Sequence, residues 1–449
     1  MSSSEAPCYR LVSLPYQADP VVRLRLLRGL GNPVLLDSAA GTPRFARYSI
    51  LAAGPQKLIS PQSGETGLRV LERLRAAIHE LAPASWPEGA ELPFGAGALG
   101  YISYDFGRIL ETLPSSAQAD IRLPSLQMGI YAWSIVSDHR LQLCWLVCHP
   151  SLPQDQQQAL LERLRAPAPA PEPFDLAAPF QPEQSRNEYQ NAFERVQEYI
   201  HAGDCYQINL SQRFKADCQG DPLGAYQRLR KACPVPFAAY LEGTDHSLLC
   251  LSPERFLSVT AGVVETRPIK GTRARGRTEE EDLLLAQELQ ESVKDRAENL
   301  MIVDLLRNDL SRACQAGSVK VPELFKLESY PNVHHLVSSV SGRLAPGKDA
   351  LDLLAGAFPG GSITGAPKIR AMQIIEELEP VRRSLYCGSI GYLGCEGQMD
   401  LNIAIRSLVH QDDALYCWGG GGIVADSQAE AEYQETLTKI RVLMNALLS

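Results

Sequence analysis

The feature that most constrains the fold is a run of alternating prolines at residues 166–173, which read APAPAPEP. Proline lacks a backbone N–H and has a fixed φ, so this run can form neither a helix interior nor a central strand, and it favours an extended chain. Before the run the sequence is strand-rich, and after it strands alternate with long helices. We therefore predict an N-terminal subdomain at residues 1–165, a linker at 166–184 and a second domain at 185–449, with the two parts packed together.

Composition narrows the class of protein. The 449 residues, 45% hydrophobic and 21% charged, are enough for a large buried core. A net charge of −9 argues against a nucleic-acid binder, which needs concentrated lysine and arginine. Residues 1–10 carry no basic start followed by a long apolar stretch, and the eleven cysteines lack metal or redox spacing. We predict a cytoplasmic protein with reduced thiols that binds neither nucleic acid nor membrane.

Two segments after the linker place polar residues in unusual settings. Residues 203–214 (GDCYQINLSQRF) predict a turn and a strand in which Gln207, Asn209 and Ser211 share one face, a pattern that usually faces solvent. Farther on, Glu254 precedes a strand, and Lys270 lies in PIKGT beside a glycine that would let a ligand approach the backbone. On local sequence alone, a solvated loop lysine is an equally good interpretation.

Two helices carry acidic residues. Ser292 can cap a helix with Asp295 at its third position, and Glu298 then lies next to the apolar face of that helix. In the closing helix, Glu432, Glu435 and Lys439 share one face, which by itself usually indicates an exposed series of ion pairs.

Several motifs together resemble the chorismate-utilising enzymes, which include anthranilate, isochorismate, salicylate and aminodeoxychorismate synthases. They are PIKGTRARG (268–276), RAENLMIVDLLRND (296–309), HHLVS (334–338), GSITGAPK (361–368), GSIGY (388–392), IAIRS (403–407), GGGIVADS (420–427) and AEYQETLTK (431–439). The resemblance spans roughly residues 185–449 and is looser before them. It implies an α/β fold of the α+β type, in which two large, mainly antiparallel β-sheets pack together with helices outside.

The resemblance also implies a chorismate site that holds Mg²⁺. Glu298 and Glu435 match the metal carboxylates and Glu432 a supporting acid, consistent with the oxygen ligands that Mg²⁺ prefers. Residues matched to substrate binding are Gln207, Thr272, His335, Thr364, Tyr386, Arg406, Gly420, Gly421, Gly422 and Lys439. In the N-terminal part, LLDS at residues 35–38 resembles the segment that forms an aromatic amino-acid pocket, so Ser38 is a candidate for such a pocket.

Two positions indicate a branch of the family. Isochorismate and salicylate synthases have a lysine general base where this chain has Gln207, and a neutral amide cannot activate water. Anthranilate synthases have alanine in PIAGT, whereas aminodeoxychorismate synthases resemble this chain in having lysine, here Lys270. The resemblance implies that Lys270 attacks the ring while Glu254 protonates the departing hydroxyl, giving 4-amino-4-deoxychorismate for p-aminobenzoate and folate. We expect burial, Arg267 and Mg²⁺ to lower the pKa of Lys270, and we expect a raised pKa for Glu254.

The source of ammonia must lie elsewhere. The nearest match to a glutaminase nucleophile turn, at residues 394–397, has the wrong spacing. We therefore expect a separate glutamine amidotransferase subunit as partner. Two alternatives remain open: the large subunit of an anthranilate synthase, and a non-catalytic regulator that binds chorismate or an amino acid.

Overall fold

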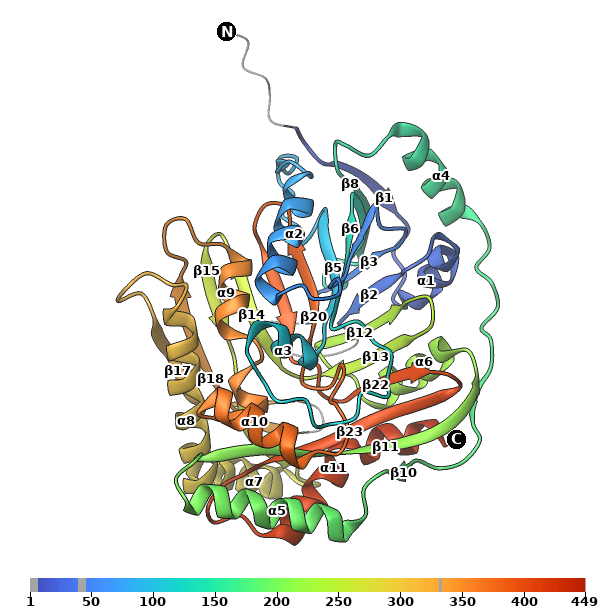
Figure 1. Ribbon diagram of the computed structural model, residues 1–449. Helices are drawn as coiled ribbons and strands as arrows, with labels where there is room; N and C mark the ends of the chain where they lie inside the picture. Colours follow the sequence, from blue (N-terminus) through green and yellow to red (C-terminus); the bar gives the residue numbers. More distant parts are fainter. Residues whose placement is uncertain (1–6, 39–45, 331–332, 449) are drawn as a thin grey trace.

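Two large β-sheets form the centre of the molecule, and the helices lie outside them (Figure 1). The structure is a computed structural model that describes residues 7–38, 46–330 and 333–448. Each strand pairs with its neighbours in antiparallel fashion, for example β11 with β23 and β16 with β18. The predicted fold class is confirmed.

The larger sheet runs through eleven strands, with two short strands added on β11. In spatial order they are β1 (Arg10–Leu14), β8 (Leu143–Cys148), β7 (Trp133–Asp138), β3 (Tyr48–Ala52), β2 (Val34–Asp37), β12 (Phe237–Glu242), β13 (Ser247–Ser252), β22 (Ser407–Gln411), β23 (Ala414–Ile423), β11 (Gln207–Gly220) and β10 (Gln181–Pro182), with β9 (Phe174–Leu176) and β19 (Gly365–Ala366) on β11.

The second sheet has ten strands, nine of them in one path. They are β16 (Ile269–Ala274), β18 (Val333–Arg343), β15 (Val263–Thr266), β14 (Arg255–Thr260), β21 (Met399–Asn402), β20 (Ser389–Gly394), β5 (Gly97–Ile102), β6 (Leu126–Tyr131) and β4 (Lys57–Ile59), with β17 (Lys320–Ser329) beside β18.

Strands from both halves of the chain are interleaved in both sheets. β2 pairs with β12, and β5 pairs with β20, so residues from either side of the proline run are direct neighbours. Residues 166–173 have neither helix nor strand and cross between α4 (Gln154–Arg165) and β9. The three-part division at residues 1–165, 166–184 and 185–449 stays a prediction; residues 1–6 and 39–45 of its first part lie outside the described residues.

The remaining helices cover the outer faces of the sheets. They are α1 (Val21–Leu27), α2 (Gly67–His79), α3 (Gly107–Leu110), α5 (Arg186–His201), α6 (Pro222–Ala232), α7 (Glu279–Glu291), α8 (Val293–Ser311), α9 (Ala350–Ala357), α10 (Lys368–Leu378) and α11 (Ala429–Leu447), with 3₁₀ turns η1 (Arg28–Leu30), η2 (Tyr104–Phe106) and η3 (Gly361–Ile363). The predicted cap of α8 is confirmed, since the Ser292 side chain accepts a hydrogen bond from the Asp295 N–H. Within the described ranges, none of the helices is both long and apolar enough to cross a bilayer.

The polar face of β11 is buried, so the expectation of a solvent face was wrong. Gln207, Asn209 and Ser211 are only 1%, 7% and 3% exposed. The opposite face, with Ile208 and Leu210, packs in one hydrophobic cluster with residues of α5 and α10. Because both faces of β11 are covered, the alternation of polar and apolar residues along this strand does not distinguish a solvent-exposed face from a buried one.

One buried arginine joins three segments beside β11. The Arg383 guanidinium donates hydrogen bonds to both carboxylate oxygens of Glu379, at 2.7 and 2.9 Å, and to the Ile363 carbonyl at 2.9 Å. It also donates to the Asn209 carbonyl on β11. Arg383 is 1% exposed and Glu379 is 5% exposed. This pair therefore connects the end of α10, η3 and β11.

Replacing Arg383 by methionine should leave the buried carboxylate of Glu379 without a cation, bonded, among the described residues, only by the N–H and the hydroxyl of Ser211. We expect the free energy of unfolding to fall by about 3–5 kcal/mol. Urea denaturation measures this loss. Arg122→Met is the matched control, because Arg122 pairs with Asp412 while both side chains are more than half exposed, and it should cost less than about 1 kcal/mol. Equal losses in the two variants would contradict the anchoring role of Arg383.

Candidate functional site

Lys270 and Glu254 are joined through a single residue, Ser362. The Lys270 Nζ donates a hydrogen bond to the Ser362 carbonyl at 2.9 Å, and the Ser362 hydroxyl donates to Glu254 Oε1 at 3.0 Å. Lys270 lies on β16, Glu254 between β13 and β14, and Ser362 in η3. Three segments far apart in sequence therefore place a lysine and a carboxyl group side by side, and the lysine does not extend into bulk water.

The glycine after Lys270 is required by the backbone. Gly271 has a φ of +87°, in the left-handed region, and a Cβ there would lie 2.9 Å from side-chain atoms of Asp295 and Leu289. The pairing of β16 with β18 shifts register between Ile269 and Thr272. This irregularity lets α7 and α8 pack closely on the strand that carries Lys270.

Glu254 is held in a form suited to donating a proton. It is 6% exposed, and its backbone N–H donates to the Ser252 hydroxyl at 3.2 Å. Burial raises the pKa of its carboxyl to about 7, even though the Lys270 charge and the Ser362 hydroxyl both lower it. The expected upward direction is confirmed.

The pKa of Lys270 is lowered, also as expected. Burial is the main cause and the Lys439 charge adds to it, while Glu298 and Glu254 oppose it. Arg267 had been expected to help, but its guanidinium is bonded to Glu323 and Glu328, each at 2.6 Å. The cation that acts on Lys270 is therefore Lys439.

Three glutamates from two helices gather near this lysine. Lys294 Nζ lies 4.0 Å from Glu298 Oε1 on α8 and 3.8 Å from Glu432 Oε1 on α11. Lys439 bonds Glu435 at 2.7 Å. The Glu298 and Glu435 charges both raise the pKa of Lys270, which places these two within electrostatic reach of the amine. Glu432 acts on the pKa of Glu298 and is itself acted on by Glu435, so we call Glu298, Glu432 and Glu435 the three-glutamate cluster.

The donor set of the three-glutamate cluster fits magnesium. It offers only carboxylate oxygens, which suit a hard cation that is commonly held by one or two carboxylates together with substrate and water. Burial raises the pKa of Glu298 and of Glu432, so both carboxylates lack full charge compensation. Among the described residues, no three or more histidine, cysteine or acidic side chains lie close enough together to hold a metal ion by themselves. The assignment of Glu298 and Glu435 as Mg²⁺ ligands, with Glu432 in support, stays a prediction.

The glycines of β23 let other groups reach its backbone. A Cβ on Gly420 would lie 2.7 Å from the Tyr386 hydroxyl, and one on Gly422 would lie 2.3 Å from Gln207 Nε2. A Cβ on Gly421 would lie 3.0 Å from a Glu432 oxygen and 3.6 Å from a Glu435 oxygen. Side chains at these positions would displace the predicted site residues.

The side-chain amide of Gln207 has unused hydrogen-bonding capacity. Both polar atoms of its side-chain amide are buried without a hydrogen-bond partner among the described residues. A buried amide without partners costs roughly 1–3 kcal/mol. Such a group beside the glycine strand marks a position where a bound molecule would pair.

His335 on β18 and Thr272 on β16 are paired on neighbouring strands of the second sheet, and the charge of Arg406, just before β22, reaches His335. His335 Nδ1 and the Thr272 hydroxyl are 2.8 Å apart. Burial, with smaller contributions from Arg406 and His334, lowers the pKa of His335 to about 3. His335 is therefore neutral near pH 7, and it can donate or accept one hydrogen bond at each ring nitrogen according to its tautomer.

The Thr364 hydroxyl is used within its own loop. It donates to the Gly360 carbonyl at 3.0 Å, and the residue is fully buried. Its predicted contact with substrate stays a prediction. Sequence reasoning missed Ser362, which lies only two residues before Thr364 in the GSITGAPK motif, and it missed Lys294, four residues before Glu298 on α8.

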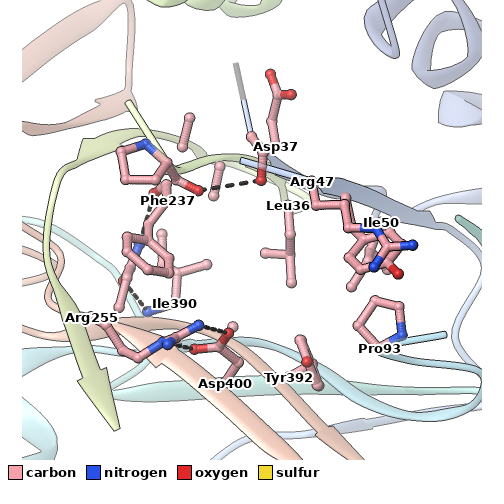
Figure 2. Close-up of a pocket in the computed structure, with 17 residues that line it drawn as sticks. Leu36, Asp37, Arg47, Ile50, Pro93, Phe237, Arg255, Ile390, Tyr392 and Asp400 are labelled. Carbon is pink, nitrogen blue, oxygen red and sulfur yellow. Dashed lines mark hydrogen bonds and ion pairs between the residues drawn. The ribbon is translucent and has the colours of Figure 1, made fainter. Parts of the chain in front are cut away.

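A separate cavity of about 340 Å³ lies between the two sheets. Figure 2 shows its lining, which includes Phe237, Arg47 and the ion pair of Arg255 with Asp400 at 2.8 Å. Ser38 also lines it, and its hydroxyl donates to the Pro236 carbonyl at 3.3 Å. The mixture of apolar and charged walls suits a small amphipathic molecule, and whether an aromatic amino acid binds there stays a prediction. The described residues that line it do not include Lys270, Glu254 or the three glutamates, so this cavity is separate from the candidate functional site.

Known proteins match both the sequence and the fold. A family model for chorismate binding enzymes matches residues 31–445. The chain belongs to this family. Aminodeoxychorismate synthase component 1 of Salmonella typhimurium is 44% identical over 448 residues, covering 97% of this chain and 98% of the relative.

Other members are similar over nearly the same length. Anthranilate synthase component 1 of Thermus thermophilus is 41% identical and covers 90% of each chain. The crystal structure of anthranilate synthase component I from Streptococcus pneumoniae superposes with a TM-score of 0.78 at 34% identity, covering 90% of this chain and 93% of that one. The resemblance to the chorismate-utilising enzymes is thus confirmed for the family and for the fold.

The raised pKa of Glu254 predicts a pH-dependent gain in stability for Glu254→Gln. Its carboxyl has a pKa of about 7 in the folded chain against an ordinary 4.5. Between these values the unfolded chain has lost the proton while the folded chain keeps it, so the wild type loses stability as pH rises through this window. The variant should match the wild type near pH 4 and exceed it at pH 8 by roughly 3 kcal/mol. Urea denaturation at both pH values tests this, with Glu88→Gln at an exposed position as control; a gain that is the same at both pH values would contradict it.

Proposed function

We propose that this member of the family aminates chorismate to 4-amino-4-deoxychorismate, with Lys270 as nucleophile. The observation that carries the proposal is the position of the Lys270 amine, which is bonded to Ser362, adjoins Glu254 and lies within electrostatic reach of Glu298 and Glu435. A lysine with a lowered pKa and a carboxyl with a raised one are the pair that nucleophilic attack with proton donation requires.

Each step balances in atoms and charge. The free amine of Lys270 attacks ring carbon 2, the two ring double bonds shift, and the bond from carbon 4 to its hydroxyl breaks. Glu254 gives its proton to that hydroxyl, which leaves as water. At this point the Lys270 nitrogen bonded to carbon 2 carries a positive charge and Glu254 is ionised. Ammonia then adds at carbon 4, the double bonds shift back, and Lys270 departs as a free amine. The new ammonium group on carbon 4 returns one proton to Glu254. Two displacements return the new amino group to the position that the hydroxyl occupied.

The chain's other residues bind and orient the substrate. Mg²⁺, when bound by Glu298 and Glu435, supplies a positive charge that pairs with the ring carboxylate. Arg406 offers a planar donor pair, with Tyr386 and the N–H groups of the glycine strand, for the enolpyruvyl carboxylate. Gln207 is a neutral amide with free donor and acceptor, which can orient ammonia or substrate but cannot take a proton from water.

Ammonia comes from a partner in this proposal. The relatives are named component 1, which supports a division between this chain and a glutamine amidotransferase subunit. The product would retain its enolpyruvyl group, and a separate lyase reaction would then give p-aminobenzoate for folate.

A second candidate is the anthranilate synthase reaction, because relatives with that name are 41% identical. Lys270 argues for the first reaction, since the resemblance places alanine there in anthranilate synthases. A non-catalytic regulator is disfavoured by the presence of Glu254, Lys270 and the three-glutamate cluster together.

Product analysis tests the reaction directly. With chorismate, Mg²⁺ and an ammonium salt, mass spectrometry should find aminodeoxychorismate, and Lys270→Ala should lose most of it. Glu254→Gln should slow turnover about 100-fold or more while chorismate still binds. Lys326→Ala, on an exposed part of β17, is the control and should retain wild-type rates. Anthranilate as the main product, or near-normal turnover in Lys270→Ala, would refute this assignment.

The division of labour predicts a clear substrate dependence. The purified chain alone should use ammonium salt and should fail with glutamine, because it has no glutaminase turn. Adding a glutamine amidotransferase subunit from a related enzyme should restore glutamine use. Glutamine-dependent amination by the isolated chain would contradict the need for a partner.

A further inference from the structure

We propose that Ser362 is a positioning residue that holds the general acid and the nucleophile in one geometry. The inference rests on the proposed function, in which Glu254 and Lys270 perform those roles. Ser362 contacts both groups at once, since its hydroxyl donates to Glu254 Oε1 at 3.0 Å and its carbonyl accepts from Lys270 Nζ at 2.9 Å.

The loop that carries Ser362 is braced on several sides. The Thr364 hydroxyl donates to the Gly360 carbonyl at 3.0 Å, and Arg383 donates to the Ile363 carbonyl at 2.9 Å. A Cβ on Gly361 would lie 2.4 Å from the Leu305 side chain, so the loop lies close against α8. Ser362 itself is 7% exposed. A residue held this firmly can fix the position of the groups bonded to it.

The carbonyl contact orients the amine. A neutral lysine amine has two hydrogens and one lone pair. Donation of one hydrogen to the Ser362 carbonyl fixes the direction of that bond and limits where the lone pair points. Because attack on a ring carbon requires the lone pair, this bond selects the approach of Lys270.

The hydroxyl contact acts on Glu254. A hydroxyl that donates to a carboxylate favours its ionised form, whereas burial favours the protonated form. The charged groups that act on Glu254 are Lys270 and Lys439, and both also favour ionisation. A backbone hydrogen bond from Ile269 acts in the same direction. The Ser362 hydroxyl is thus one of four groups that keep proton release by Glu254 possible near neutral pH, and it is the one side chain that a mutation can remove without changing a charge.

The experiment compares Ser362→Ala with Ser362→Thr in the full chain, with Mg²⁺, chorismate and saturating ammonium. A general acid works when protonated, so activity falls as pH rises through the pKa of Glu254. Loss of the hydroxyl should raise the pKa of Glu254, so the alkaline limb of the kcat profile should move to higher pH. The expected shift is about one pH unit, which corresponds to the free energy of one charge-assisted hydrogen bond. It should also lower kcat about tenfold with little change in KM. Ser362→Thr, which keeps the hydroxyl, should restore both.

A matched control separates positioning from folding. Ser134 is fully buried on β7 and its hydroxyl donates to the Gly95 carbonyl at 3.0 Å, so Ser134→Ala removes one buried hydrogen bond outside the site. The Ser134→Ala variant should have the same alkaline limb in its kcat profile as the wild type.

The outcomes distinguish the inference from the proposed function. If Lys270→Ala and Glu254→Gln lose activity but Ser362→Ala keeps the wild-type pH limb, the positioning role is overturned while the reaction assignment stands. If Lys270→Ala and Glu254→Gln remain active, the proposed function fails and the role of Ser362 fails with it. A shifted limb in Ser362→Ala that Ser362→Thr reverses supports the inference.

Discussion

The buried pair of Arg383 and Glu379 is the interaction on which the site depends. One guanidinium bonds the carboxylate at the end of α10, the Ile363 carbonyl in η3, and the Asn209 carbonyl on β11. An ion pair this deep is costly to desolvate, and its remaining donors must be satisfied for it to be tolerated. Here the spare donors are used to hold backbone carbonyls, so the pair fixes the segment that carries Ser362 relative to the strand that carries Gln207.

The proposed catalytic groups reduce the stability of the fold. Glu254 is buried and Lys270 partly buried, and burial opposes the charge of each. Neither amide atom of Gln207 has a hydrogen-bond partner in the part of the chain that the structure describes. A core built only for stability would use apolar groups at these places. Their presence together, beside glycines that keep β23 open and glutamates suited to Mg²⁺, is better explained by what binds there.

The comparison of sequence with structure shows where local reasoning fails. The alternating polar residues of β11 are typical of a solvent-exposed face, but both faces of that strand are covered. Alternation shows only which residues share a face of the strand, and it does not show what packs against that face. Arg267 is three residues from Lys270, yet it lies between β15 and β16 and bonds Glu323 and Glu328 on β17. Ser362 went unnoticed because serine in a glycine-rich loop has no distinguishing pattern. Its importance comes only from contacts with Glu254, 108 positions away in the chain.

The sequence by itself determined the family, the fold class and the capped start of α8, and it singled out Glu254, Lys270 and the glutamates as candidates. These features are encoded locally, by motifs, capping residues and hydrophobic periodicity. They can therefore be predicted from short segments without the rest of the chain. The tertiary structure decided which strands of the two halves pair, which polar residues are buried, which cation acts on Lys270, and that Ser362 joins acid and amine. Each of these features depends on the distances between residues far apart in sequence and on the exclusion of water between those residues. A local stretch of sequence determines neither the distances nor the exclusion of water.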